Sequence, residues 1–169
     1  RDAPFEARPS IVASNAIARA AVAEEAAKAH GLAIGTDAEE LYADINALAP
    51  RLGKRLREGA SGLHLWGGEP TVILPENPGQ GGRNQALALL IAREIAGRDD
   101  IRVLVAGTDG TDGPTDAAGA IVDGSTWEAS AQEALDRADA GAWLDARGAL
   151  LRTGPTGTNV MDLVIALKS

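Results

Sequence analysis

The sequence predicts an α/β protein, a three-layer α/β/α sandwich with a mixed, partly parallel sheet. Short runs of β-branched and aliphatic residues alternate with longer segments whose apolar residues recur every three or four positions, as in strands alternating with helices. Of the 169 residues, 45% are hydrophobic and only 3% are aromatic, so small aliphatic side chains would fill one sizeable core. We expect residues 1–8 to form a linker and residues 9–169 to form a single domain.

The first expected elements are a short strand at Ser10–Ala13 and a helix at Ala16–His30. Asn15 is a residue type that caps helix N-termini, and Gly31 is one that ends helices in the left-handed conformation. The chain starts at Arg1 rather than at a methionine, so we expect it to be a fragment.

A second helix is expected after Asp37, which has the capping-box spacing with Glu40. Apolar residues then occur at spacings of four, three, four and four, which marks one face of a helix: Leu41, Ile45, Leu48, Leu52 and Leu56. Pro50 is expected to break or kink this helix. Two short strands, Leu63–Trp66 and Thr71–Leu74, come next, and their closeness in the sequence favours a mixed sheet.

The C-terminal half continues the alternation. A helix at Arg83–Ala96, stopped by Gly97, precedes a strand at Ile101–Ala106. Periodicity does not decide whether Ala117–Val122 crosses the sheet as a strand or opens a short helix. The remaining expected elements are a helix that the capping-box pair Ser125 and Glu128 opens and that runs to Ala138, a helical turn at 142–146, and a final strand at Val160–Leu167.

Three carboxylates lie close together in the loop after the strand at Ile101–Ala106. Asp109, Asp112 and Asp116 are separated by glycines, threonines and a proline, and hard oxygen ligands of this kind suit Mg²⁺. The alternative is structural, with the acids forming Asx turns and Asp116 capping the element that starts at Ala117. We favour a site, because open α/β sheets bind ligands at the carboxyl ends of their strands. Candidate phosphate-binding residues in the same loop are Gly107, Thr108 and Gly110.

The glycine-rich segment before the helix at Arg83 is the second candidate loop. Gly81 and Gly82 let the backbone approach an anion, and the helix start, including Asn84, offers N–H groups at the positive end of the helix dipole. Arg83 would clamp a carboxylate or phosphate through two N–H donors. The alternative is an ordinary connection in which Arg83 pairs with a surface glutamate.

Two further loops carry polar groups. The segment Thr153–Asn159 has the hydroxyl and backbone N–H groups of an anion nest, but it lacks the lysine of a P-loop, and its structural alternative is a hairpin turn. Glu69, between two expected strands, is either a turn residue or a metal ligand, general base or partner of Arg83. The candidate ligands in the first of these loops are Thr156, Gly157, Thr158 and Asn159.

Composition argues against several classes of function. The chain has no cysteine and two isolated histidines, which excludes disulfides and thiolate chemistry and disfavours a zinc site. The formal net charge of −8 disfavours nucleic acid as a partner. The sequence contains no apolar stretch of membrane-spanning length and no signal segment, so we expect a cytoplasmic protein without a membrane partner.

Four segments together resemble the signature blocks of the type II glycerate kinases, a family often labelled hydroxypyruvate reductase, and in particular its MOFRL domain. The resemblance covers nearly the whole chain and extends back to Pro9. In one segment, Ala138–Ala142, the chain departs from the Asn-Asp-Ser-Tyr-like stretch of the family, which removes the basis for a substrate contact there. The four matching segments are Gly67–Val72, Gly81–Gln85, Ala106–Ala120 and Thr153–Val160.

The resemblance implies a two-domain enzyme that transfers the γ-phosphoryl group of ATP to a hydroxyl of glycerate with Mg²⁺, in a cleft between its domains. It implies that Arg83 holds the substrate carboxylate or the transferring phosphate and that Asp109 and Asp112 lie near the metal. The larger N-terminal domain of that family is absent from this chain, so we expect the chain alone to be inactive. A homodimer is a further expected assembly.

Two alternative functions stay open. One is a hydroxypyruvate reductase. The chain lacks a Gly-x-Gly-x-x-Gly turn between a strand and a helix, which argues against this function. The other is a non-catalytic domain that binds an anion or a protein partner.

Overall fold

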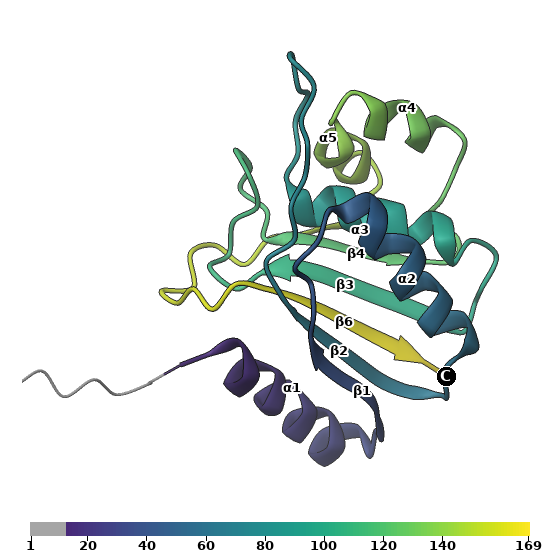
Figure 1. The fold of residues 1–169 in the computed structure, drawn as a ribbon, viewed down its shortest axis with the longest axis vertical. Coiled ribbons are helices and arrows are strands. Elements are labelled where there is room, and N and C mark those ends of the chain that lie inside the picture. The colour runs from purple at the N-terminus through teal and green to yellow at the C-terminus, as the bar shows by residue number, and fades with distance from the viewer. Residues whose placement is uncertain (1–12) are drawn as a thin grey trace, which may run out of the picture.

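The computed structural model describes residues 13–169 and shows a mixed sheet of six strands with helices on both faces (Figure 1). The strand order is β1-β2-β6-β3-β4-β5; β1 and β2 are parallel, and the other neighbours are antiparallel. The predicted fold class is therefore confirmed. The strands are β1 Ile34–Glu39, β2 Gly62–Gly68, β3 Ile101–Gly107, β4 Gly119–Asp123, β5 Leu150–Leu151 and β6 Asp162–Lys168.

The helices form the two outer layers. Helix α1 (Asn15–His30) lies along one face near β1 and β2, whereas α2 (Ile45–Glu58) and α3 (Arg83–Glu94) cover the other face (Figure 1). The short helices α4 (Ser130–Asp136) and α5 (Ala140–Asp145) pack beside α3. None of the helices in residues 13–169 is both long and apolar enough to cross a membrane.

The core lies between the sheet and the α2–α3 layer. In β3 the side chains alternate, so that Ile101, Val103 and Val105 are buried while Arg102 on the opposite face is exposed. The helices close this core with apolar residues at helical spacing, including Leu48 and Leu52 of α2 and, from α3, Leu87 and Ile91.

The N-terminal predictions are partly corrected. Ser14, rather than Asn15, caps α1, because its Oγ accepts a hydrogen bond of 3.2 Å from the backbone N–H of Ile17. Gly31 ends α1 with φ +65°, as predicted. The linker at residues 1–8 and most of the strand expected at Ser10–Ala13 lie outside the described residues; Ala13 itself is not in a strand.

The capping box proposed for Asp37 and Glu40 is wrong. Residues 34–39 form β1, which pairs in parallel with β2, and α2 begins eight residues after Asp37 at Ile45. Asp44 is its cap and accepts a 2.8 Å hydrogen bond from Asn46 N. Pro50 lies inside α2, which continues to Glu58.

Two more local predictions fail, and one alternative is decided. Thr71–Leu74 is not a strand: Thr71 makes one isolated bridge, and Ile73 is 88% exposed. Ser125 does not start a helix, because its N–H and hydroxyl both bind Asp123 Oδ1 in a turn, and α4 starts at Ser130. The segment Ala117–Val122 enters the sheet as β4.

Candidate functional site

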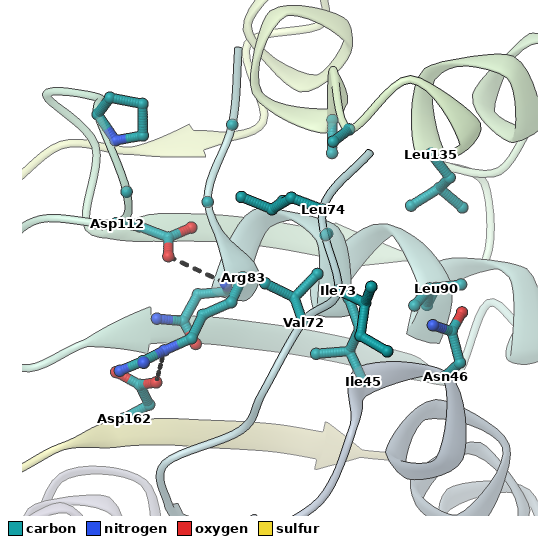
Figure 2. A pocket seen from close by; sticks show the side chains of 18 of the residues that line it. Ile45, Asn46, Val72, Ile73, Leu74, Arg83, Leu90, Asp112, Leu135 and Asp162 are labelled. Atoms are coloured by element: carbon teal, nitrogen blue, oxygen red, sulfur yellow. Dashed lines mark hydrogen bonds and ion pairs between the residues drawn. The ribbon is translucent and has the colours of Figure 1, made fainter. Parts of the chain in front are cut away.

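A cavity of about 770 Å³ opens at the edge of the sheet where β2 and β3 end and β6 begins. Its two ends differ in chemistry, with charged side chains around Arg83 and an apolar groove beside them (Figure 2). The apolar side chains of the groove are Ile45, Val72, Ile73, Leu74, Leu90 and Leu135, and the charged end is lined by Glu69, Arg83, Asp109, Asp112 and Asp162. Asn46, Arg93, Gln132 and Asp136 also line the cavity. The acidic and glycine-rich loops therefore meet at this cavity.

Arg83, the first residue of α3, is held at the charged end by two carboxylates. Its Nε donates a hydrogen bond of 2.7 Å to Asp162 Oδ2, and its Nη1 lies 3.2 Å from Glu69 Oε1 (Figure 2 shows the first contact). Within residues 13–169, Asp162 and Glu69 are the acidic partners of the guanidinium, and each accepts from one of its N–H donors. The other three of its five N–H donors have no carboxylate partner in these residues. Those donors suit an anionic ligand.

Asp112 occupies the N-terminus of α3. Its Oδ1 and Oδ2 accept backbone hydrogen bonds from Asn84 N at 3.0 Å and Gln85 N at 2.8 Å. Gly82 makes this approach possible, because a Cβ there would lie 2.3 Å from Asp112 Cγ. Two of the helix N–H groups that the sequence suggested for a bound phosphate, those of Asn84 and Gln85, are therefore satisfied within the protein.

The Asp112 carboxyl is 3% exposed, and burial raises its pKa to about 6 although the N–H groups of Asn84 and Gln85 oppose the shift. Burial also raises the pKa of Asp162, against the effect of the Arg83 guanidinium. Both shifts follow from moving a carboxylate out of water.

Asp109 and Asp116 differ in position. Asp109 lines the cavity, and its Oδ1 accepts from Thr111 N at 2.9 Å, which makes an Asx turn. Asp116 lies outside the cavity lining and pairs with Arg152 at 3.0 Å. Within residues 13–169, no three acidic or histidine side chains converge into a ready-made metal site. A metal at Asp109 would therefore need ligands from a bound substrate or water.

The loop at residues 153–159 is hydrogen-bonded to the acidic loop. Thr156 donates from its backbone N–H to the carbonyl of Asp109 at 3.2 Å and from its hydroxyl to the carbonyl of Thr108. Of its predicted ligands, Asn159 lines the cavity, whereas Thr156, Gly157 and Thr158 do not. In the other two loops, Gly81, Gly82 and Asn84 line the cavity, whereas Gly107, Thr108 and Gly110 do not.

Sequence reasoning missed Asp162. It is the first residue of β6, it is 3% exposed, and it makes the shortest contact to Arg83. The signal was a single carboxylate in the otherwise apolar run Val160–Leu167, because a buried strand tolerates a charge only where that charge is paired.

The charged end carries more negative than positive groups. At this end the guanidinium of Arg83 lies among four carboxylates, Glu69, Asp109, Asp112 and Asp162. Elsewhere in the lining, Arg93 and Asp136 add one charge of each sign. An anionic ligand would be repelled by this excess unless a cation accompanied it. The arrangement therefore fits an anion bound together with a metal ion or with basic groups from another polypeptide segment.

The fold and the site define a three-layer α/β domain with a charged cleft at one edge of a mixed sheet. The sequence matches the MOFRL family over residues 62–162. The chain belongs to this family, as the sequence blocks predicted.

Its relatives include glycerate kinases. It is 38% identical to a glycerate 2-kinase of Pyrococcus horikoshii over 93% of this chain and 38% of that protein, and 50% identical to a D-glycerate 2-kinase of Thermotoga maritima over 61% of this chain and 26% of that protein. The crystal structure of the Thermotoga maritima glycerate kinase superposes with a TM-score of 0.79 at 38% identity, over 88% of this chain and 40% of that one. The chain thus spans two fifths or less of the length of these relatives.

Proposed function

We propose that the chain is the C-terminal domain of a glycerate kinase-like enzyme, which transfers the γ-phosphoryl group of ATP to a hydroxyl of glycerate with Mg²⁺. The observation that carries this proposal is the guanidinium of Arg83, held by Asp162 and Glu69 with further donors available at a 770 Å³ cavity. A planar cation fixed in this way can bind a carboxylate or phosphate through two parallel hydrogen bonds.

The donor set fits Mg²⁺ when a phosphate supplies part of its coordination. Asp109 lines the cavity, and only its Oδ1 is engaged by side-chain or backbone donors of the described residues, at Thr111. Magnesium in phosphoryl-transfer sites takes one or two carboxylates and leaves the remaining positions to water and substrate oxygens. The bound ion would neutralise charge on the transferring phosphate, and it would offset the excess of carboxylates around Arg83.

The size of the cavity supports two ligands. A three-carbon acid fills only part of 770 Å³, a volume typical of sites for much larger molecules. We place glycerate and the transferring phosphate at the charged end, near Arg83 and Asp109. The apolar groove is then free for another part of the nucleotide or for a segment of the larger remainder that the relatives possess.

Product analysis of the complete enzyme tests this proposal. Incubation with glycerate, ATP and Mg²⁺, followed by ³¹P NMR, is expected to show a phosphoglycerate whose amount equals the ADP formed. Oxidation of NADH with hydroxypyruvate in place of phosphoglycerate formation would instead favour the reductase. Anion binding without either reaction would favour a non-catalytic domain.

A further inference from the structure

A second buried polar cluster lies outside the cavity, between α1 and the sheet. The residues that α1 buries are Asn15 and Arg19, both polar. Arg19 pairs with Asp37 and, at 3.2 Å, with Glu39, both on β1. A helix that buries two polar side chains in place of apolar ones needs those groups for more than packing.

The amide of Asn15 binds the backbone at the start of β6. Its Nδ2 donates to the carbonyl oxygens of Val160 at 2.9 Å and Asp162 at 3.1 Å, while its Oδ1 accepts from Arg19. The Arg19 contact sets the amide orientation, because a flipped amide would place two donors against each other. The sheet leaves room for this arrangement at Gly67, where a Cβ would lie 1.6 Å from Asn15 Oδ1.

The segment that Asn15 holds is strained and is also held from its other side. Met161 has φ +69°, an uncommon conformation for a residue other than glycine. Thr108 Oγ1 donates to the carbonyl of Met161 at 2.7 Å and accepts from Val160 N at 2.8 Å. A strained turn persists only where surrounding contacts fix it, and such turns cluster at functional sites.

The same segment carries the carboxylate that holds Arg83. Asp162 follows Met161 directly, and its Oδ2 lies 2.7 Å from Arg83 Nε. A continuous set of hydrogen bonds therefore runs from Arg19 through Asn15 and the turn at 160–162 to the guanidinium at the cavity.

We infer that Asn15 is a positioning residue for Arg83: by holding the strained turn at 160–162 from α1, it fixes Asp162 and so the direction of the guanidinium. This inference rests on the proposed function only in that Arg83 is taken as the anion ligand. Asn15 does not line the cavity itself. Its effect reaches the cavity through backbone carbonyls that have no other side-chain partner in residues 13–169.

Two substitutions separate positioning from simple support of α1. Asn15→Asp keeps the size and the acceptor toward Arg19 but replaces the Nδ2 donor with an oxygen that faces two carbonyl oxygens. Ser14→Ala removes the N-cap hydrogen bond of α1 and leaves the Asn15 amide in place. Ser14→Ala therefore weakens α1 without touching the turn, whereas Asn15→Asp disturbs the turn.

The measurement is ¹⁵N NMR of the Arg83 Nε–Hε group in the labelled chain, assigned with Arg83→Lys and combined with titration by inorganic phosphate in the presence of Mg²⁺. Asn15→Asp is expected to shift or broaden that resonance and to weaken phosphate binding about tenfold. Ser14→Ala is expected to keep the wild-type resonance and affinity while lowering the melting temperature. If Asn15→Asp does not fold, Asn15→Ser serves in its place, since its shorter side chain cannot reach both carbonyls.

An unchanged Arg83 resonance in the Asn15 variant would overturn the inference, and so would an equal change in Ser14→Ala. Failure of the wild-type chain to bind phosphate in the presence of Mg²⁺ would count against Arg83 as the anion ligand, and hence against the proposed function. The resonance would still decide the role of Asn15, so the two failures are distinguishable.

Discussion

Asp112 Oδ2 accepts a 2.8 Å hydrogen bond from the backbone N–H of Gln85, a residue 27 positions earlier in the chain. Together with the bond from Asn84, this contact makes Asp112 the cap of α3, whose own N-cap residue is glycine and has no side chain for the purpose. The acidic loop is thereby attached to the start of the helix that carries Arg83. The position of the acidic loop and the position of the Arg83 guanidinium therefore depend on each other.

The stability of the domain is expected to depend on pH through Asp112. The folded pKa of Asp112, about 6, lies above its ordinary value of 3.8, so the native state retains this proton to a higher pH than the unfolded state does. The contribution of Asp112 to the free energy of unfolding is therefore greatest below about pH 4, falls as pH rises to about 6 and is constant above. Urea denaturation from pH 4 to 7 measures it.

Asp112→Asn is the comparison for this measurement. The variant is expected to be less stable than wild type throughout, because an amide nitrogen cannot accept a hydrogen bond from the helix N-terminus. The difference between the two proteins should shrink as pH rises from about 4 to 6. A constant difference would show that Asp112 titrates normally.

Arg83→Ala is expected to lower the turnover of the complete enzyme by about 10²–10³, equivalent to about 3–4 kcal/mol, because a fixed cation that stabilises transition-state charge is lost. Arg93→Ala is the matched control. Arg93 lines the same cavity but lies over Trp127 and binds Gln132. Steady-state kinetics of both variants measure the effect. Equal losses of turnover in the two variants would show that Arg83 does not stabilise the transition state specifically.

Asp109→Asn is expected to raise the Mg²⁺ concentration needed for half-maximal activity by about tenfold, since it replaces an anionic oxygen ligand at similar size. Asp116→Asn should leave that concentration unchanged, because Asp116 pairs with Arg152 away from the cavity. Titration of activity with Mg²⁺ distinguishes them. A larger rise of the half-maximal Mg²⁺ concentration in the Asp116 variant would indicate that Asp116, not Asp109, is the metal ligand.

Gly67→Ala is expected to destabilise the chain by about 3 kcal/mol, because the new methyl group would collide with Asn15 in a close-packed interior. Gly97→Ala is the control, with φ +79° and no atom within 4 Å of an added Cβ. It should cost about 1 kcal/mol from backbone strain alone. Equal melting temperatures for the two variants would mean that α1 moves aside freely.

The 169-residue chain alone is expected to fold, to bind phosphate or glycerate weakly, and to show no glycerate-dependent ATP consumption. Phosphoryl transfer needs donor, acceptor and metal held together out of water, and we assign one wall of that cleft to this chain. A coupled assay, run with and without the remainder of the enzyme, tests this. Turnover by the chain alone would show that it contains the whole nucleotide site.

Local sequence patterns determined most of the helices and strands. The spacing of apolar residues predicted α3, β3 and β6 to within two residues at each end, because a regular period depends only on neighbours along the chain. The glycine-rich and acidic segments both line the cavity, because Asp112 of the loop after β3 caps the helix that the glycine-rich segment precedes.

Only the tertiary structure decided which polar groups bind each other. Asp37 belongs to β1, which pairs with β2, and therefore does not cap a helix. The side chains of Asp112 and Asp116, suggested as ligands, bind other residues of the protein. Asp162 and Asn15 became important through contacts with residues 79 and 147 positions away. A hydrogen bond depends on distance and direction in space, and the sequence specifies these only after the sheet has brought remote segments together.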